Sequence, residues 1–293
     1  MASLKDIRAK IDTTKNTQQI TRAMKMVSAA ALRRAQHNIV NLRPYANAIL
    51  TIIADIAATQ RVSHPLLTRT ENPQKVLLVI MTSDRGLAGA FNTNVNKYAE
   101  RFLRENKSKY EKIDVLVIGR KAADYMRRRD VKPIDTIMNL AKTVSYPLAA
   151  KVAERLMEAY KSGEYDEIKV VYNEFKSAIS QQVVAETLLP IDMSTAGTLN
   201  KGTNGFPPDM IFEPAPELII EQLIVKHFTV QVYRCMSESV AAEHGARMTS
   251  MENATKNAGE MINSYTLTYN KLRQANITTE LIEITSGAEA LKG

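Results

Sequence analysis

The chain has 293 residues, of which 45% are hydrophobic and 24% charged, and its formal net charge at pH 7 is +8. No segment approaches the run of ~20 apolar residues that a membrane-spanning helix needs, and the polar N-terminus lacks the apolar core of a signal peptide. The single cysteine, Cys235, excludes an intramolecular disulfide and fits a reducing compartment. Composition therefore predicts a cytosolic protein of bacterial type, with one large domain or two ordinary ones.

Residues 1–60 carry the pattern of a long coiled-coil helix. Apolar or small residues recur at alternating steps of three and four, which keeps one stripe of a supercoiled helix facing a partner. Ser3 and Asp6 form a start that resembles a capping box, and Pro44 is expected to kink or break the helix. The stripe consists of Leu4, Ile7, Ile11, Leu32, Ala35, Ile39, Leu42, Ala46, Ile49, Ile53 and Ile56.

The middle of this stripe is polar. Between Ile11 and Leu32 its positions hold Thr14, Gln18, Thr21, Lys25 and Ser28. A second apolar stripe takes over there, made of Ile20, Met24, Val27 and Ala31. We therefore expect this stretch of the helix to present a different face, and to present it to another molecule.

Residues 75–191 read as an α/β domain. Val76 to Met81 form a continuous apolar run rich in branched residues, which is typical of a buried parallel strand. Strand, turn and helix then alternate in the order of an open, mostly parallel sheet. The expected strands are 76–81, 115–118, 169–172 and 186–190, and the expected helices are 92–106 (capped by Asn92 or Asn94), 121–129 and 147–160.

Residues 192–216 are rich in Gly, Pro, Asn, Ser and Thr and are predicted to be a surface linker. Residues 217–293 repeat the three-four pattern, with one slip in phase near Met251. We therefore predict a Rossmann-like domain inserted between the two halves of a long antiparallel coiled coil, with helices of roughly 80 to 100 Å. The positions of the second stripe are Val225, Phe228, Val232, Cys235, Ala242, Ala246, Met251, Ala254, Ala258, Met261, Tyr265, Leu272 and Ala275.

The charge is distributed unevenly. Residues 1–43 hold nine cations and two anions, whereas residues 217–293 hold seven cations and nine anions. Opposite net charges favour pairing of the two terminal helices, and the excess positive charge on the first helix remains for an acidic partner. A merely solvated basic face is the alternative interpretation.

The turn at residues 82–92 is the one place that looks like a nucleotide site, because it follows a buried strand and contains two glycines. Its spacing matches neither the dinucleotide fingerprint nor a P-loop, and Gly119-Arg120 stands where an acidic residue would hold a ribose. We therefore interpret Gly86 and Gly89 as residues of a tight, closely packed turn, and we expect no cofactor.

Catalytic and metal-binding patterns are also missing. The four histidines, His37, His64, His227 and His244, lack ligand spacing, and we interpret His37 and His227 as solvated helix residues. Cys235 lies in the helical stripe, which favours a packed, inert thiol. No nucleophile-elbow motif occurs, so the sequence predicts a protein without catalytic machinery.

Three segments, in the same order and spacing, resemble the gamma subunit family of F-type ATP synthases, of bacterial type. The resemblance covers the whole chain. Its segments are SLKDIRAKIDTTKNTQQITRAMKMVSAAALRRAQ (3–36), TSDRGLAGAFN (82–92) and ARMTSMENATKNAGEMINSYTLTYNKLRQANITTELIEITSGAEAL (246–291).

The resemblance implies the central rotor shaft of a rotary enzyme, itself non-catalytic, inside a hexamer of three alpha and three beta subunits. Its foot, built on the α/β domain, would sit with the epsilon subunit on the membrane ring of c subunits. The location implied is the cytoplasmic face of the bacterial inner membrane. Rotation of the asymmetric shaft would couple ion flow to ATP synthesis or hydrolysis, with ATP bound by the hexamer and not by this chain.

The resemblance also assigns partner-binding residues. Met24 and Lys25 match positions near an acidic lever loop of beta, and the neighbouring cations Arg8 and Arg22 are expected to face that loop. Arg273 and Gln274 match residues that engage other beta loops, higher on the shaft. These six residues are the predicted contact sites.

Two features depart from what the resemblance leads us to expect. Gly245 follows His244 inside a helix, where glycine costs about 1 kcal/mol relative to alanine, so close packing is expected there. The cysteine-bearing regulatory insert of chloroplast members is absent, which argues against thiol regulation.

Two other classes of protein remain as alternatives. A free-standing α/β nucleotide-binding protein that dimerises through helical arms would need a ligand fingerprint after Met81 or Ile118. A basic coiled-coil nucleic-acid binder would need base-stacking aromatic residues or a recognition helix.

Overall fold

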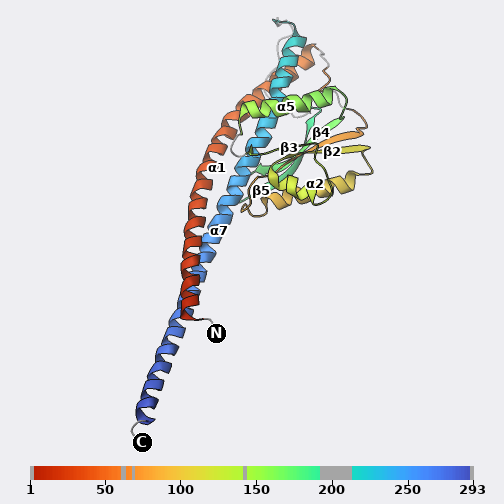
Figure 1. The fold of residues 1–293 in the computed structure, drawn as a ribbon. Coiled ribbons are helices and arrows are strands. Elements are labelled where there is room, and N and C mark those ends of the chain that lie inside the picture. The colour runs from red at the N-terminus through yellow and green to blue at the C-terminus, as the bar shows by residue number, and fades with distance from the viewer. Residues whose placement is uncertain (1–2, 61–63, 68–69, 141–143, 192–212, 291–293) are drawn as a thin grey trace. The chain divides into compact units, whose positions relative to one another are not determined.

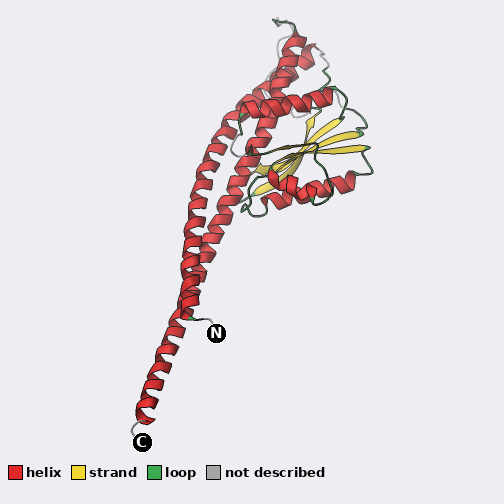
Figure 2. Cartoon of the chain, in the orientation of Figure 1, coloured by secondary structure: helices red, strands yellow, loops and turns green. Residues whose placement is uncertain are grey.

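The structure, a computed structural model, describes residues 3–60, 64–67, 70–140, 144–191 and 213–290. Two long helices, α1 (Leu4–Gln60) and α7 (Pro216–Ala290), stand at the two ends of the chain with a five-stranded α/β domain between them in sequence (Figures 1 and 2). The predicted fold class is confirmed. None of the helices in the described ranges is long and apolar enough to cross a membrane.

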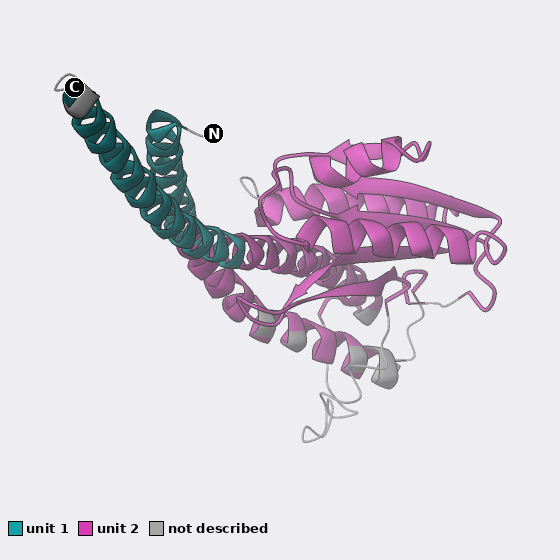
Figure 3. Ribbon diagram, turned by 90° about the horizontal axis from the view of Figure 1, so that it is seen from below, with its two compact units in different colours: residues 1–28, 248–293 teal, residues 29–247 magenta. Residues whose placement is uncertain are grey.

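The chain divides into two compact units (Figure 3). Unit 1 contains Met1–Ser28 and Met248–Gly293, and unit 2 contains Ala29–Arg247. The boundaries that the sequence suggests, at residues 60, 75, 191 and 216, stay a prediction. Most of the predicted linker, residues 192–212, lies outside the described residues.

In unit 1 the beginning of α1 lies antiparallel to the last part of α7, as predicted. Gln18 Nε2 donates to the Thr255 carbonyl oxygen (3.3 Å), and Thr255 Oγ1 donates to Thr21 Oγ1 (2.8 Å). Lys25 Nζ pairs with the Glu252 carboxylate at 2.6 Å. As residue numbers rise along α1 their partners fall along α7, which defines the antiparallel register.

The polar stretch of α1 keeps its face towards α7. Thr21 is 9% exposed and Ser28 only 2%, whereas Ile20 and Val27 are 60% and 69% exposed. The polar positions therefore stay in the seam, and Ile20 and Val27 of the second apolar stripe lie on a different, exposed face, as expected. Hydroxyl and amide groups pair across the helix interface. That another molecule covers the face of Ile20 and Val27 stays a prediction.

Two local features of α1 test the expectations for this helix. The Ser3 and Asp6 side chains each accept a hydrogen bond from the other residue's backbone N–H, at 3.2 and 3.1 Å, which confirms the capping box. The helix continues through Pro44 without the break that proline favours. Burial of the flanking apolar stripe compensates for the missing hydrogen bond. In unit 2 that stripe is buried at Leu32, Ala35, Ile39, Ala46, Ile49, Ile53 and Ile56.

The α/β domain contains a sheet in the order β3-β2-β1-β4-β5. The first four strands in that order are parallel, and β5 pairs antiparallel with β4. The strands are β1 (Lys75–Met81), β2 (Lys112–Ile118), β3 (Asp135–Ile137), β4 (Glu167–Phe175) and β5 (Gln181–Leu189). The helices of the domain are α2 (Phe91–Asn106), α3 (Arg120–Arg127) and α5 (Tyr146–Lys161).

Helices cover both faces of this sheet (Figures 1 and 2). On one face α2 and α3 enclose a core of fully buried aliphatic residues, among them Ile80, Val117 and Val171. On the other face lies α5. Because successive residues of a strand point to opposite faces, Tyr172 faces away from the α2 side, and its hydroxyl is within hydrogen-bonding distance of the Glu238 carboxylate of α7 (3.3 Å).

Two local expectations are wrong in detail, and strand β3 is not among the expected strands. The three-residue strand β3 is too short and polar to be recognised from periodicity, which needs four residues or more. β5 begins at Gln181, five residues before the expected start at Glu186, because an edge strand needs few apolar residues. The N-cap of α2 is Ala90. Asn92 is not the cap, because its side chain accepts hydrogen bonds from the backbone N–H and the hydroxyl of Ser83.

Gly119, at the end of β2, is the position where glycine is strictly required. Its φ is +107° and its ψ 137°, a conformation that side-chain-bearing residues rarely adopt. A Cβ atom at this position would lie 2.2 Å from the Thr82 carbonyl oxygen. The close approach brings the ends of β1 and β2 together, and Ala122 N–H donates to Thr82 Oγ1 at 2.9 Å.

We predict that Gly119→Ala lowers the free energy of unfolding by about 3 kcal/mol or more, because backbone strain and a steric overlap add. Gly163→Ala is the matched control, since Gly163 also has a positive φ (+73°) but no atom within 4 Å of the position that a Cβ would take. The control should lose only ~1 to 2 kcal/mol. Urea denaturation of the full chain measures both, and equal losses would contradict the steric argument.

Candidate functional site

The C-terminal ends of the parallel strands pack against α7. In open α/β sheets, ligands bind beyond these ends at the point where the strand order reverses, which here lies between β1 and β4. α7 fills this position within unit 2. Its Ala242 and Ala246 form an apolar cluster with Ala88 and Phe91, and Phe175 at the end of β4 packs against the cluster.

Gly245 allows this close approach. A Cβ atom on Gly245 would lie 3.3 Å from the Ala178 carbonyl oxygen and 3.4 Å from both Ala178 Cα and Phe175 Cε2. Contacts this short need the neighbouring backbone to move. The expectation that packing explains the glycine inside this helix is therefore supported by the geometry.

An ion pair within α7 meets the turn that follows β1. Arg247 pairs with Glu243 at 2.8 Å, and both side chains are at least nine-tenths buried. Arg247 also donates to the Gly86 carbonyl oxygen at 3.3 Å. Burial raises the pKa of Glu243, although the Arg247 charge opposes the shift. The turn that most resembles a phosphate site thus binds an arginine of the chain itself.

A second polar cluster joins α7 to β4 and β5. Arg234 lies 2.5 Å from a carboxylate oxygen of Glu186 and 3.5 Å from Glu238, and it donates to the Tyr172 hydroxyl at 3.0 Å. The Tyr172 hydroxyl donates to Glu186 at 2.9 Å. Burial raises the pKa of Tyr172 and of Glu238. We call Tyr172, Glu186, Arg234 and Glu238 the Arg234 cluster.

Of the two histidines of α7, His227 is buried and His244 is half-buried, and His227 corrects an expectation from the sequence. His227 is 2% exposed, so the interpretation as a solvated residue is wrong. Burial lowers the pKa of His227 to about 4, and that of His244 to about 4 as well. Both rings are therefore neutral at pH 7. The stripe pattern could not show this, because it identifies only the stripe residues themselves as buried. His227 is not one of them but lies next to the stripe residue Phe228, which is 1% exposed.

Cys235 is a free, fully buried cysteine, as predicted. Burial raises the pKa of its thiol to about 12, which keeps the reactive thiolate scarce. No group of three or more His, Cys, Asp or Glu residues in the described ranges could hold a metal ion.

The glycines of the turn after β1 play unequal parts. Gly89 has φ +55°, a left-handed backbone conformation that glycine adopts more readily than other residues. A Cβ on Gly86 would meet only Lys121 Cε at 3.9 Å, so the expectation that packing requires Gly86 is wrong. The other left-handed residue is Leu87, with φ +62° and an exposed fraction of 63%.

The comparisons with known proteins agree with one another. A family model described as ATP synthase matches residues 3–291. The ATP synthase gamma chain of Bdellovibrio bacteriovorus is 65% identical over 295 residues, which covers 100% of both chains. The chain belongs to the ATP synthase gamma chain family. The gamma chain of Geobacter metallireducens is 47% identical, again over 100% of both chains.

Solved structures of ATP synthases share the fold of this gamma chain family member. A chain in the Euglena gracilis mitochondrial OSCP/F1/c-ring structure has a TM-score of 0.67 and 25% identity, over 98% of this chain and 94% of that one. A chain in the central stalk and c-ring structure from Tetrahymena thermophila has a TM-score of 0.61 and 29% identity, over 80% and 99%.

The six predicted contact residues all lie on helices of unit 1. Arg8 and Arg22 are exposed on α1, fourteen residues apart and therefore on one face, with exposed Lys15 midway between them. Met24 is half-buried, and Lys25 is engaged with Glu252 inside the chain. Arg273 and Gln274 are exposed on α7. The roles of all six residues stay predictions.

α7 continues beyond its partner helix in unit 1. The register of Gln18 and Thr255 places Leu4, the first residue of α1, opposite residues near 270. All side chains from 273 to 288 are exposed. Large apolar residues are among them: Ile277 (48%), Leu281 (58%), Ile282 (59%) and Ile284 (67%). A lone helix with this composition is stable only if another surface covers it.

Sequence patterns did not predict the Arg234 cluster or the Glu243–Arg247 pair. One signal for them exists, because Arg234 and Glu238, like Glu243 and Arg247, stand four residues apart within a stretch otherwise rich in small and apolar residues. Charges in such a stretch need partners. Which strand supplies Tyr172 or Glu186 is beyond any local pattern.

We predict that Arg234→Met lowers the free energy of unfolding by about 3 kcal/mol, because it leaves two carboxylates without their cation. Lys176→Met is the matched control, since it breaks the more exposed Lys176–Glu174 pair and should lose at most ~1 kcal/mol. Urea denaturation of the full chains gives both values. Similar losses in the two variants would contradict a stabilising role of the cluster.

We predict that the purified chain does not bind ATP, because α7 fills the crevice in which an α/β sheet would hold a nucleotide. Isothermal titration calorimetry of the full chain should show no saturable heat up to millimolar ATP. One stoichiometric site of micromolar affinity would contradict the prediction.

Proposed function

We propose that this chain is the central rotor shaft of an ATP synthase, which couples ion flow to ATP synthesis or hydrolysis. The observation that carries the proposal is full-length membership of the gamma chain family, at 65% identity to one member. The related chains of solved structures belong to a central stalk with c-ring and to an F1/c-ring assembly. The alternative, a free-standing nucleotide-binding protein, has no support in the geometry of the crevice.

The proposed role is mechanical and non-catalytic. A shaft must transmit force between its α/β domain and its long helices without slipping. Directional, largely buried ion pairs such as those of the Arg234 cluster oppose slippage better than apolar packing, because any displacement leaves buried charges unpaired. The Glu243–Arg247 pair and the close contact at Gly245 add a second fixed point on α7.

We propose that the partners are three alpha and three beta subunits, an epsilon subunit and a c-subunit ring. The complex would be peripheral to the inner membrane on its cytoplasmic face. The last part of α7 supports insertion into a closely fitting channel formed by other subunits. Its exposed apolar side chains would be buried there: Ile277, Leu281, Ile282 and Ile284.

We propose that the two groups of contact residues act on beta by different physics. Arg8, Arg22 and Lys25 would attract an acidic loop across a sliding contact, through charge without fixed geometry. Met24 would pack beside Lys25. Arg273 and Gln274 would donate directional hydrogen bonds, which are stronger when a guanidinium meets a carboxylate.

We predict that Arg273→Ala lowers ATP turnover of the reconstituted complex by about tenfold, the loss expected for one charge-assisted hydrogen bond. Lys25→Ala should lower turnover less than about fivefold, because a partly exposed pair contributes ~0 to 1 kcal/mol. Reversing Arg8, Arg22 and Lys25 together to Glu should do more than Lys25→Ala, since attraction becomes repulsion.

Turnover is normalised to intact hexamer on native gels, so that loss of assembly is not counted as loss of activity. Lys271→Ala is the control for Arg273→Ala, because Lys271 is an exposed cation on the same helix, two residues away and on another face. Glu252→Gln is the control for the internal pair of Lys25. Equal turnover for Arg273→Ala and the parent would remove Arg273 from the proposed site.

A further inference from the structure

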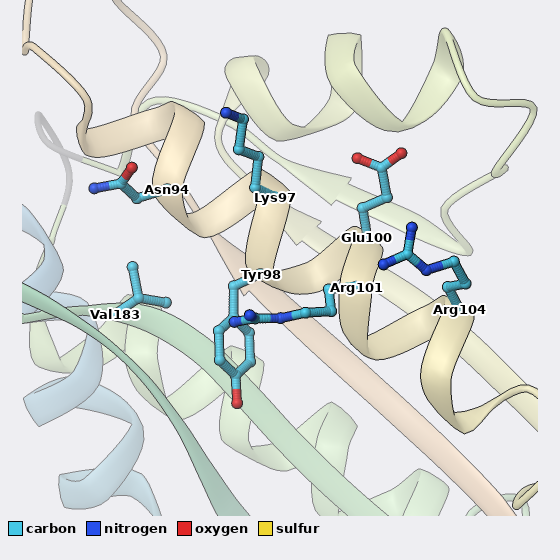
Figure 4. A pocket seen from close by; sticks show the side chains of 7 residues that line it. All are labelled: Asn94, Lys97, Tyr98, Glu100, Arg101, Arg104 and Val183. Atoms are coloured by element: carbon cyan, nitrogen blue, oxygen red, sulfur yellow. The ribbon is translucent and has the colours of Figure 1, made fainter.

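A groove of about 600 Å³ lies along α2, between this helix and the edge strand β5 (Figure 4). α2 supplies Asn94, Lys97, Tyr98, Arg101 and Arg104 to its lining, and β5 supplies Val183. The groove is on the α2 face of the sheet, where Val183 packs at the border of the core. It is therefore on the opposite face from the Arg234 cluster.

The three cations of the groove share one face of α2. Lys97, Arg101 and Arg104 follow each other at steps of four and three, the spacing that stacks side chains along one helical stripe. All three are exposed. Like charges at this spacing destabilise a helix, so local helix stability does not explain the arrangement.

No carboxylate of the described chain forms an ion pair with any of these cations. The acidic residue on the groove wall, Glu100, is engaged elsewhere: Arg129 Nε and the Tyr125 hydroxyl both donate to its carboxylate at 2.6 Å. The hydrogen bond from Arg129 lowers the pKa of Glu100, and Arg104 adds to the effect from a distance. Within the described residues, Lys97 and Arg101 are left without a neutralising partner.

The surroundings strengthen the positive potential. Residues 91–132 hold twelve Lys or Arg and six Asp or Glu, an excess of six positive charges within 42 residues. Such a concentration of one sign attracts and steers an acidic partner. The Arg101 guanidinium lies over the Tyr98 ring, 5.3 Å from its centre, which holds it in place before a ligand arrives.

We propose that this groove binds an acidic, extended segment of another polypeptide of the same assembly. Lys97 and Arg101 are separated by a rise of ~6 Å along the helix, and alternate residues of an extended chain lie ~7 Å apart. Two carboxylates at alternate positions can therefore reach both cations. The apolar surface of Val183 is available to a side chain of the same segment.

The geometry favours a polypeptide over other anions. A phosphate site usually offers backbone N–H groups at a helix N-terminus, whereas the donors here are side chains spread along the middle of α2. A membrane surface would meet a flat face and not a groove. Single-stranded nucleic acid would need free aromatic faces, and the Tyr98 ring is covered by Arg101.

The proposal rests on the proposed function only in requiring that the chain assembles with other subunits. The test uses the complex purified through a tag on this chain from its native host, treated with a water-soluble carbodiimide that joins amines to carboxylates in contact. Mass spectrometry then locates the products. Lys97 should couple to an Asp or Glu of another subunit with about tenfold the yield of exposed Lys107, because the reaction needs ion-pair contact.

The cross-linking yield at Lys97 also tests whether Arg101 and Arg104 attract the same partner. Arg101→Gln/Arg104→Gln should lower the Lys97 yield about tenfold, since both attractive charges are removed. Lys107→Gln/Arg128→Gln makes the same change of charge outside the groove and should leave the yield within about twofold. Equal yields in the two double variants, or no inter-subunit product at Lys97 in the unaltered complex, would overturn the proposal.

Further outcomes distinguish a failure of the proposed function from a failure of the groove proposal. If the chain co-purifies with no other subunit, the proposed function fails, and the groove proposal falls with it. If the assembly is intact but Lys97 forms no product, only the groove proposal fails. The full chain can also be sedimented with vesicles of equal parts phosphatidylglycerol and phosphatidylethanolamine. If it binds them, and if Arg101→Gln/Arg104→Gln but not the control double variant abolishes the binding, the surface binds lipid. That result would overturn the proposal of a polypeptide ligand.

Discussion

The close packing of the sheet's C-terminal edge against α7 is the contact on which the rest of unit 2 depends. Ala242, Gly245 and Ala246 present a face almost without side chains, so Phe175 and the backbone at Ala178 approach the helix directly. Such contact gives many small dispersion gains but little resistance to sliding. The ion pairs of Arg234 and Arg247, which lie on either side of the small residues, are directional and therefore resist sliding of the helix along the sheet.

The same contact is the reason for our prediction that this sheet binds no nucleotide. The crossover helices and strand order are those of a nucleotide-binding sheet, and the strand reversal creates a crevice beyond β1 and β4. In this chain the crevice is filled by a helix that is covalently part of the protein. A nucleotide would have to displace the apolar cluster around Phe91 and leave Glu243 and Arg247 without their surroundings. The fold therefore provides an attachment for a helix where related folds provide a ligand site.

The two faces of the sheet are used in different ways. On the side of Tyr172 the charges are satisfied within the chain, through Arg234 and its two carboxylates. On the α2 side Lys97 and Arg101 have no such partner in the described structure. A satisfied network fixes internal geometry, whereas uncompensated charge attracts other molecules. This contrast separates the surface that holds the domain in place from the one that we assign to a partner.

Local patterns were enough to identify the elements and the family. The three-four spacing of residues such as Leu32 and Ile53, and the apolar run from Val76 to Met81, specify helix and strand through periodicity and burial. The glycine at 245 could be interpreted as a packing device, because its cost within a helix requires a compensation.

Only the tertiary structure decided which residues that are distant in the sequence come into contact. The polar seam between Thr21 and Thr255 stays closed because the Thr255 hydroxyl donates to the Thr21 hydroxyl across the helix interface. His227 is buried beside the stripe, although its type suggests exposure. Tyr172 and Glu186 complete the site of Arg234 from strands that lie 62 and 48 residues away in the sequence. A buried charge needs a partner, and this much a sequence can show, but only the arrangement of strands and helices determines which residue supplies it.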